Sequence, residues 1–216
     1  MKLNPIMEKL LQKNYPDDIL LTLIVGASGS GKSSLEQALI DKGYWSVRSY
    51  TTRPKRDKFD NGHIFVSKEE FDALPDKVAY TEFDGYEYCA TKEQVDKADI
   101  YIIDPSGVEK LKELYRTDRE IAIVYLDTRE EICKNRMKAR GDSDEQIAQR
   151  LENDRSIFKI ENINPDAVID GNMKLKSVVN TFEEVYRTLL FNAKLNRLET
   201  EEVAECRFIS QDPRLP

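Results

Sequence analysis

The feature that most constrains the fold of this chain is a glycine-rich stretch, Gly26 to Ser33 (GASGSGKS), that follows directly on a continuous apolar run. The run, Ile19 to Val25, has the length and composition of a strand buried on both faces. After the glycines, apolar residues recur at helical spacing from Ser33 to Asp41. Strand, glycine loop and helix in this order predict the first unit of a parallel α/β domain.

The glycine-rich stretch matches the pattern G-x-x-x-x-G-K-[ST] of phosphate-binding loops. Glycines let successive backbone N–H groups turn toward phosphate oxygens at the positive end of the following helix. Lys32 would add a charge at the β and γ oxygens, and the Ser33 hydroxyl would ligate Mg²⁺. A glycine turn that matches by chance is the alternative, and the flanking strand and helix disfavour it. The expected ATP-binding residues are Gly26, Ala27, Ser28, Gly29, Ser30, Gly31, Lys32, Ser33 and Ser34.

Further apolar runs of strand length alternate with helical patterns. Strands are expected at Trp45 to Arg48, Asp99 to Ile103, Ile121 to Leu126 and Ala167 to Ile169, and helices at Val108 to Tyr115, Arg129 to Ala139 and about Leu175 to Phe191. Such alternation requires crossover connections, which produce a parallel sheet. We therefore predict an α/β fold of the P-loop NTPase type, with a parallel sheet of about five strands flanked by helices.

Asp104 stands at the end of one predicted strand, where a carboxylate would lie near the metal in a fold of this type. It is therefore a candidate metal-site residue together with Ser33. A carboxylate before Pro105 is also a common way to start a loop or helix, and the sequence leaves both interpretations open.

The pattern changes between Tyr44 and Ala98, where short β-like pieces surround one helix near Lys68 to Leu74. We interpret this region as an inserted acceptor-binding subdomain. The expected organisation is an N-terminal helical extension (1–18), a main domain (19–195, with core 19–48 and 99–195, acceptor subdomain 49–98 and a helical lid at about 136–155) and a C-terminal extension (196–216).

Composition excludes several classes of protein. The formal net charge of -7 argues against binding that depends on nucleic acid phosphates, and no apolar stretch reaches the roughly 18 residues of a membrane helix. The amino terminus has no apolar signal-peptide run, so we expect a cytoplasmic protein. The cysteines, Cys89, Cys133 and Cys206, are odd in number and far apart, which disfavours a disulfide framework or a zinc site.

Three segments occur in the order found in the guanylate kinase family. They are Ser49 to Arg56 (SYTTRPKR), Asn61 to Val66 (NGHIFV) and a later stretch around Arg140-Gly141. Together with the phosphate loop, they make the chain resemble that family from about Leu20 to Phe191. The resemblance implies a nucleoside monophosphate kinase with an inserted acceptor subdomain and a mobile lid.

The resemblance also assigns acceptor residues. Arg53 and Arg56 would hold the acceptor's phosphate, since planar guanidinium groups match phosphate oxygens in bidentate fashion, and Tyr88 would assist. His63, Ala79 and Cys89-Ala90 stand where the family has a second phosphate-binding tyrosine, a base-reading glutamate and a Gly-[ST] pair. The identity of the acceptor's base therefore stays open. The candidate acceptor-binding residues are Ser49, Arg53, Arg56, His63, Glu82, Tyr88 and Thr91.

Two helical patterns meet at Gly141, and Ser143 and Gln146 have the spacing of a capping box for the second helix. In guanylate kinases this stretch is the lid that closes on ATP, and Arg140 and Arg150 match its arginines. With Lys32 they are the candidate catalytic residues, because they would neutralise the transferring phosphoryl group. An exposed helix with surface salt bridges is the alternative for this segment.

No separate general base is expected, because a monophosphate with a second pKa near about 6 is already ionised at neutral pH. The predicted reaction is ATP plus a nucleoside monophosphate to ADP plus the diphosphate, with Mg²⁺ as cofactor and GMP or dGMP as the first acceptors to test. One alternative is a kinase of another phosphorylated metabolite, such as ribose 1,5-bisphosphate. Another is a non-catalytic interaction module, which the intact phosphate loop disfavours.

Overall fold

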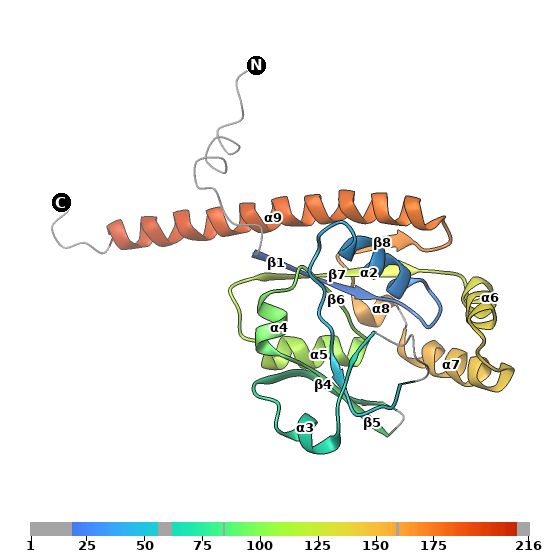
Figure 1. Ribbon diagram of the computed structural model, residues 1–216. Coiled ribbons are helices and arrows are strands. Elements are labelled where there is room, and N and C mark those ends of the chain that lie inside the picture. The colour runs from blue at the N-terminus through green and yellow to red at the C-terminus, as the bar shows by residue number, and fades with distance from the viewer. Residues whose placement is uncertain (1–18, 56–61, 84, 159, 211–216) are drawn as a thin grey trace.

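The computed structural model describes residues 19–55, 62–83, 85–158 and 160–210 of the chain. Four parallel strands form a central sheet in the order β6-β1-β7-β8 (Figure 1). They are β1 (Leu20–Val25), β6 (Ile100–Ile102), β7 (Glu120–Asp127) and β8 (Ala167–Asp170). The strand expected at Trp45 to Arg48 is reduced to one bridge, which pairs Ser46 with Ile100 beside β6. The predicted parallel α/β fold is confirmed.

Helices connect these strands and cover both faces of the sheet (Figure 1). They are α2 (Lys32–Ile40), α5 (Pro105–Leu114), α6 (Glu130–Arg140), α7 (Asp144–Ile157), α8 (Ile160–Ile163) and α9 (Leu175–Ser210). Each crossover returns the chain to the same end of the sheet, so the loops after β1, β6, β7 and β8 gather along one edge.

Strand β1 is buried on both faces and belongs to two hydrophobic cores, because successive side chains of a strand point in opposite directions. Leu20 and Ile24 pack in one core with Leu35 of α2 and with Phe182 of α9. The intervening residues, Leu21, Leu23 and Val25, pack in the other core with Val108 and Leu111 of α5. The long apolar run is thus explained by burial between two helical layers.

A second, four-stranded sheet lies beyond α5 in the order β3-β2-β5-β4 (Figure 1). Its elements are β2 (Tyr50–Thr51), β3 (Ile64–Phe65), β4 (Lys77–Phe83), β5 (Tyr86–Thr91) and the helices α3 (Lys68–Asp72) and α4 (Lys92–Asp96). Val78 and Ala90 share a core with Val108 and Leu111, so the two sheets are joined by α5.

Helix α9 is longer than expected. We predicted its end at about Phe191 and a separate C-terminal extension over 196–216, whereas the helix continues to Ser210. The buried side chains of Ala193 and Leu198 show that its apolar stripe continues past Phe191. The C-terminal end of α9 projects past the sheet (Figure 1). Residues 1–18, expected as a helical extension, and 211–216 lie outside the described residues.

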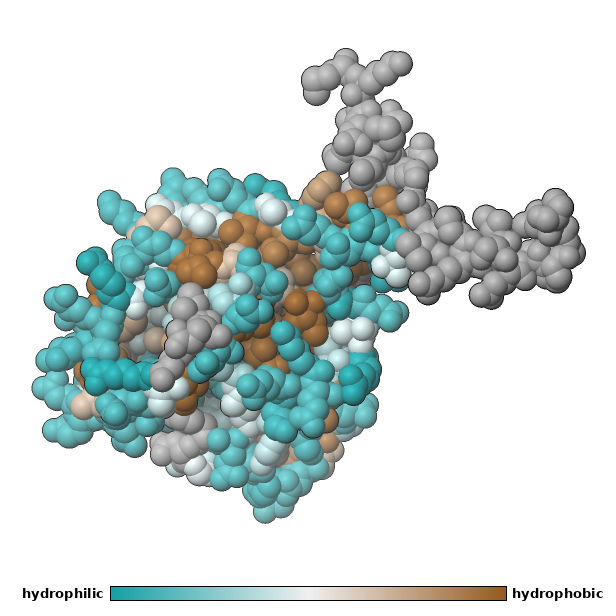
Figure 2. All heavy atoms as spheres, turned by 180° about the vertical axis from the view of Figure 1, so that it is seen from behind, coloured by the Kyte–Doolittle hydropathy of each residue, from teal (hydrophilic) through white to brown (hydrophobic). Residues whose placement is uncertain are grey.

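The face opposite to that of Figure 1 is mostly hydrophilic, with separate hydrophobic patches toward its centre and upper part (Figure 2). Dispersed apolar surface of this kind is normal for a folded domain. Among the described residues, none of the helices combines the length and apolar character needed to cross a bilayer.

The packing of α9 predicts a difference between two phenylalanines on one helix. Phe182 is fully buried against Tyr44 and Tyr186, whereas Phe191 is 39% exposed. We expect Phe182→Ala to lower the free energy of unfolding by about 3–5 kcal/mol, because it opens a core cavity. The control Phe191→Ala should change it by about 0.5 kcal/mol. Urea denaturation followed by circular dichroism measures both, and equal effects would contradict the assigned packing.

Candidate functional site

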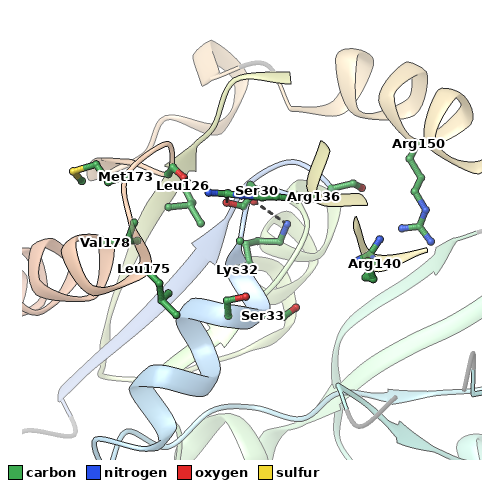
Figure 3. A pocket seen from close by; sticks show the side chains of 15 residues that line it. Ser30, Lys32, Ser33, Leu126, Arg136, Arg140, Arg150, Met173, Leu175 and Val178 are labelled. Atoms are coloured by element: carbon green, nitrogen blue, oxygen red, sulfur yellow. Dashed lines mark hydrogen bonds between the residues drawn. The ribbon is translucent and has the colours of Figure 1, made fainter. Parts of the chain in front are cut away.

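The central sheet ends in a cavity of about 580 Å³ at the edge where its loops gather. Leu126, Met173, Leu175 and Val178 make one end apolar, and Lys32, Arg136, Arg140 and Arg150 make the other cationic (Figure 3). The remaining lining residues are Ser28, Gly29, Ser30, Gly31, Ser33, Ser34 and Gly171. An elongated ligand with an apolar ring system at one end and several negative charges at the other fits this distribution.

The loop between β1 and α2 has the backbone geometry that its glycines predict. Gly29 and Gly31 have φ of 76° and 109°, and Gly31 is the N-cap residue of α2. A Cβ atom on Gly29 would lie 2.6 Å from the Cys133 carbonyl oxygen, so α6 packs directly on the loop. Positive φ and this close approach both require glycine. The N–H groups at the start of α2 are thereby presented to the cavity as an anion site.

Lys32 bends back over the loop. Its Nζ donates hydrogen bonds to the carbonyl oxygens of Gly26 (2.5 Å) and Ala27 (2.8 Å). Burial lowers the pKa of Lys32 to about 8, against the opposing effect of the Asp154 carboxylate. The buried Lys32 amine thus has too little negative charge around it to keep its usual pKa. A polyphosphate would supply that charge and restore the proton affinity of the amine.

Arg136 fixes the loop from the side of α6. Its guanidinium donates to the carbonyl oxygens of Ser30 (2.7 Å) and Gly171 (2.9 Å), which joins the loop to the segment after β8. The Thr128 hydroxyl also donates to Ser30 O, at 3.0 Å. From the sequence, Arg136 was a weaker candidate than Arg140 and Arg150 for contact with the donor, and it lines the cavity. Its spacing of four residues from Arg140 on the same helical face was the signal that pointed to it.

The apolar end of the cavity was also missed. Met173 and Leu175 follow β8, and Val178 lies in the first turn of α9. Loops at the carboxyl ends of parallel strands surround the ligand in folds of this kind. The short strand Ala167 to Ile169 was recognised in the sequence, and its position would have pointed to the residues that follow it.

The two candidate lid arginines come from different helices and meet at Asp142. Arg140 Nε donates to Asp142 Oδ1 at 3.1 Å, and Arg150 Nε lies 4.0 Å from Asp142 Oδ2. Both guanidinium groups reach into the cavity from α6 and α7 (Figure 3). The capping box predicted for α7 is confirmed, since Ser143 and Gln146 exchange the two expected hydrogen bonds. Arg140 and Arg150 therefore stand on either side of the corner between α6 and α7.

Helix α7 touches the phosphate loop through Asp154. Oδ2 of this carboxylate accepts the backbone N–H of Ser28 at 2.7 Å, and Oδ1 accepts the Ser28 hydroxyl at 3.3 Å. From the sequence, Asp154 falls within the predicted lid, where we considered it only as a partner for surface salt bridges. Only the folded chain reveals this contact, because the partners are 126 residues apart.

The two candidate metal residues differ in their surroundings. Ser33 lines the cavity in the first turn of α2. Asp104 is the N-cap of α5, where its Oδ1 accepts hydrogen bonds from Gly107 N (2.9 Å) and the Ser106 hydroxyl (2.6 Å). Its charge weakly opposes the lowering of the Lys32 pKa by burial. Hard oxygen donors of this kind suit Mg²⁺, and the described residues contain no His/Cys/Asp/Glu cluster of the kind that holds a metal by itself.

Four candidate acceptor residues lie together on the second sheet. Ser49 Oγ is 2.8 Å from His63 Nδ1, and the His63 ring packs edge-on against Tyr88 with centroids 5.5 Å apart. The register pairs Thr51 with Tyr88, which brings β5 alongside the segment that continues to Arg53. The Arg53 guanidinium lies 5.1 Å from the centre of the Phe65 ring. One surface is thus formed by strand β5 together with the segments 49–53 and 63–65.

Tyr101 connects this surface to the central sheet. It is buried on β6, hydrogen-bonds Ser49, and has its pKa raised by burial and by the Asp104 charge. We did not predict a role for it. The charge of Asp104 thus acts on both Lys32 and Tyr101.

The remaining acceptor candidates lie differently. Glu82 is exposed on β4, opposite Glu87 and one strand farther from β2 than Tyr88. Thr91 is the N-cap of α4, where its N–H donates to Gln94 Oε1 at 3.0 Å. Ala79 is buried with φ of 54° at an irregularity in β4. Arg56 lies outside the described residues, so its predicted contact with the acceptor phosphate stays a prediction.

Cys89 is fully buried beside this surface, and burial raises the pKa of its thiol to about 12. A thiol that stays protonated at neutral pH is a poor nucleophile. The role of Cys89 is therefore packing.

Comparison with known proteins agrees with this geometry. The family model described as guanylate kinase matches residues 20–189. A guanylate kinase of Polaromonas sp. is 31% identical over 154 residues (65% of this chain, 73% of the relative), and one of Helicobacter pylori is 35% identical over 152 residues (63% and 72%). The crystal structure of guanylate kinase from Anaplasma phagocytophilum is 18% identical and superposes with a TM-score of 0.53, covering 79% of this chain and 86% of that one.

The lowered pKa of Lys32 predicts how nucleotide affinity depends on pH. In the free protein Lys32 loses its proton as the pH rises through about 8, whereas bound phosphate holds that proton, so binding at high pH requires proton uptake. Between about pH 7.5 and about pH 9 the affinity for ATP should fall roughly eightfold. Isothermal titration calorimetry measures this fall.

The control for this experiment is Lys32→Ala, which should bind ATP more weakly and with little dependence on pH over the same range. A flat profile for the unchanged protein, or an equally steep one for the variant, would contradict the role given to Lys32.

Proposed function

The chain belongs to the guanylate kinase family, and we propose that it transfers the γ-phosphate of ATP to GMP or dGMP. The observation that carries the proposal is the cavity with one apolar and one cationic end, built on the glycine loop of β1. A site of this shape with an acceptor surface beside it is what direct transfer between two nucleotides requires.

In the proposed complex the adenine of ATP lies at the apolar end, against Met173, Leu175 and Val178. The triphosphate follows the loop, with Lys32 at the β and γ oxygens and the Ser33 hydroxyl toward Mg²⁺. Asp104 would approach the same metal through the oxygen that its capping bonds leave open. The metal, which arrives with ATP, neutralises charge on the phosphates.

On the acceptor side, Arg53 and Tyr88 would hold the monophosphate. His63 would donate to it from Nε2 in the tautomer in which the Ser49 hydroxyl donates to Nδ1. Residues 49–98 thus act as the acceptor subdomain. Tyr101 supports it from β6 through its bond to Ser49.

Residues of about 136–155 act as the lid in this proposal. Arg140 and Arg150 exchange their contacts with Asp142 for contacts with the transferring phosphoryl group. They would neutralise the charge on its equatorial oxygens and exclude water, which limits hydrolysis of ATP. The acceptor's phosphate oxygen is already ionised at neutral pH, so positioning and charge neutralisation suffice.

A second candidate acceptor follows from Ala79 and Ala90. Both are buried and apolar where the family reads a base edge with polar groups. Recognition of a purine edge needs paired donors and acceptors on the protein. A site that lacks some of these partners discriminates less well between bases. Another nucleoside monophosphate or a sugar phosphate therefore stays a candidate, with the same phosphate clamp.

A coupled assay for ADP tests the proposal with the four ribonucleoside monophosphates, their deoxy forms and ribose 1,5-bisphosphate. We expect turnover with GMP or dGMP well above the rate of ATP hydrolysis. If another acceptor is preferred, the choice of base is wrong and the kinase assignment stands. If no acceptor exceeds hydrolysis, the kinase assignment fails.

Arg53 provides a sharper test of the acceptor clamp. Arg53→Ala should raise the KM for the acceptor roughly tenfold or more, because a charge-assisted bidentate contact is lost, and should leave the KM for ATP nearly unchanged. Lys55→Ala is the matched control, since Lys55 also lies over the Phe65 ring, at 5.3 Å. Equal effects of the two variants would contradict a specific phosphate contact.

A further inference from the structure

The contact between Asp154 and Ser28 places a carboxylate where the site is built to take an anion. Ser28 lines the cavity, and its backbone N–H and hydroxyl both donate to this one side chain, at 2.7 and 3.3 Å. Backbone N–H groups of such a loop are the groups that phosphate oxygens use. A protein carboxylate therefore satisfies donors that belong to the phosphate site.

The electrostatics show at which end of the cavity the carboxylate lies. Asp154 is the charge that most strongly opposes the lowering of the Lys32 pKa. Its negative charge is therefore close to the amine that serves the β and γ phosphates. Two independent observations, the hydrogen bonds at Ser28 and the effect on Lys32, place Asp154 at the terminal-phosphate end.

We propose that Asp154 is a specificity-determining residue of the donor site that competes with the terminal phosphate of a nucleoside triphosphate. A triphosphate must displace the carboxylate from Ser28, both because the space is shared and because like charges repel. A diphosphate is one phosphate shorter and leaves the contact in place. The inference rests on the proposed use of this cavity for ATP, and it concerns only the donor side.

The position of Asp154 also connects this competition to the lid. Arg150 precedes it by one helical turn on α7, so the two side chains lie on the same face. One helix thus presents a cation to the cavity and an anion to the loop. Displacement of Asp154 by a γ-phosphate frees α7 to bring Arg150 onto that phosphate. After transfer, the carboxylate can return to Ser28 while ADP is still bound.

The test compares the affinities of ATP and ADP for the full chain by calorimetry in the presence of Mg²⁺ and without acceptor, at about pH 6.5 so that Lys32 is protonated. Removing an internal competitor raises the apparent affinity by the inverse of the fraction of time for which the site was free of the competitor. We expect Asp154→Ala to bind ATP about three- to tenfold more tightly and ADP with less than about a twofold change. Asp154→Asn, which keeps an oxygen but loses the charge, should show an intermediate gain.

Glu152→Gln is the matched control, because Glu152 lies on the same helix with its carboxylate on Arg155 at 3.2 Å. It removes one negative charge from α7 without touching the loop, and the ratio of the two affinities should stay as in the unchanged protein. If Glu152→Gln raised the affinity for ATP as much as Asp154→Asn does, the effect would come from net charge alone. That result would overturn the proposal.

Other results are equally decisive. A weaker or unchanged affinity for ATP in a folded Asp154→Ala variant, or equal changes for ATP and ADP, would show that Asp154 is a structural contact only. The proposed kinase function would survive that result. If the unchanged protein bound neither nucleotide, the proposed function and this inference would both fail.

Discussion

The whole structure depends on one strand that has no exposed face. Strand β1 is hydrogen-bonded to β6 and β7 at its two edges and packs against helices on its two faces. Its position is therefore fixed both within the sheet and perpendicular to it. The start of the following loop is fixed with the strand, and Gly29 and Gly31 then supply the positive φ angles that the loop needs before α2 begins. A phosphate site made of backbone groups is only as precise as the elements that hold its two ends.

The site also has an excess of positive charge, and the protein's own oxygen atoms accept hydrogen bonds from its cationic groups. Lys32 and Arg136 are held by loop carbonyl groups, Arg140 by Asp142, and the Ser28 N–H by Asp154. Each of these bonds satisfies a group that would otherwise be costly to leave without a partner in a partly buried cavity. In the proposed function, a polyphosphate would exchange them for stronger charge-assisted bonds, so that binding and rearrangement of the lid would become one process.

The sequence predicted the parts of this molecule that are determined locally. The apolar run of β1, the glycine pattern and the capping box at Ser143 each reflect short-range physics, and the structure agrees with them. The end of α9 was misplaced because the stripe past Phe191 is sparse and recognisable only once Ala193 and Leu198 are buried. Contacts such as those of Asp154 with Ser28 and of Tyr101 with Ser49 join distant segments, which no local pattern encodes.

The central claim is that one cleft holds the donor and acceptor phosphates together for direct transfer. The most direct measurement is the affinity for adenosine and guanosine joined 5′ to 5′ through five phosphates, because this compound occupies both sites only if they adjoin. The account predicts a Kd about 100-fold or more below that of ATP, as expected when a second binding event becomes intramolecular. An affinity no greater than that of ATP would contradict it.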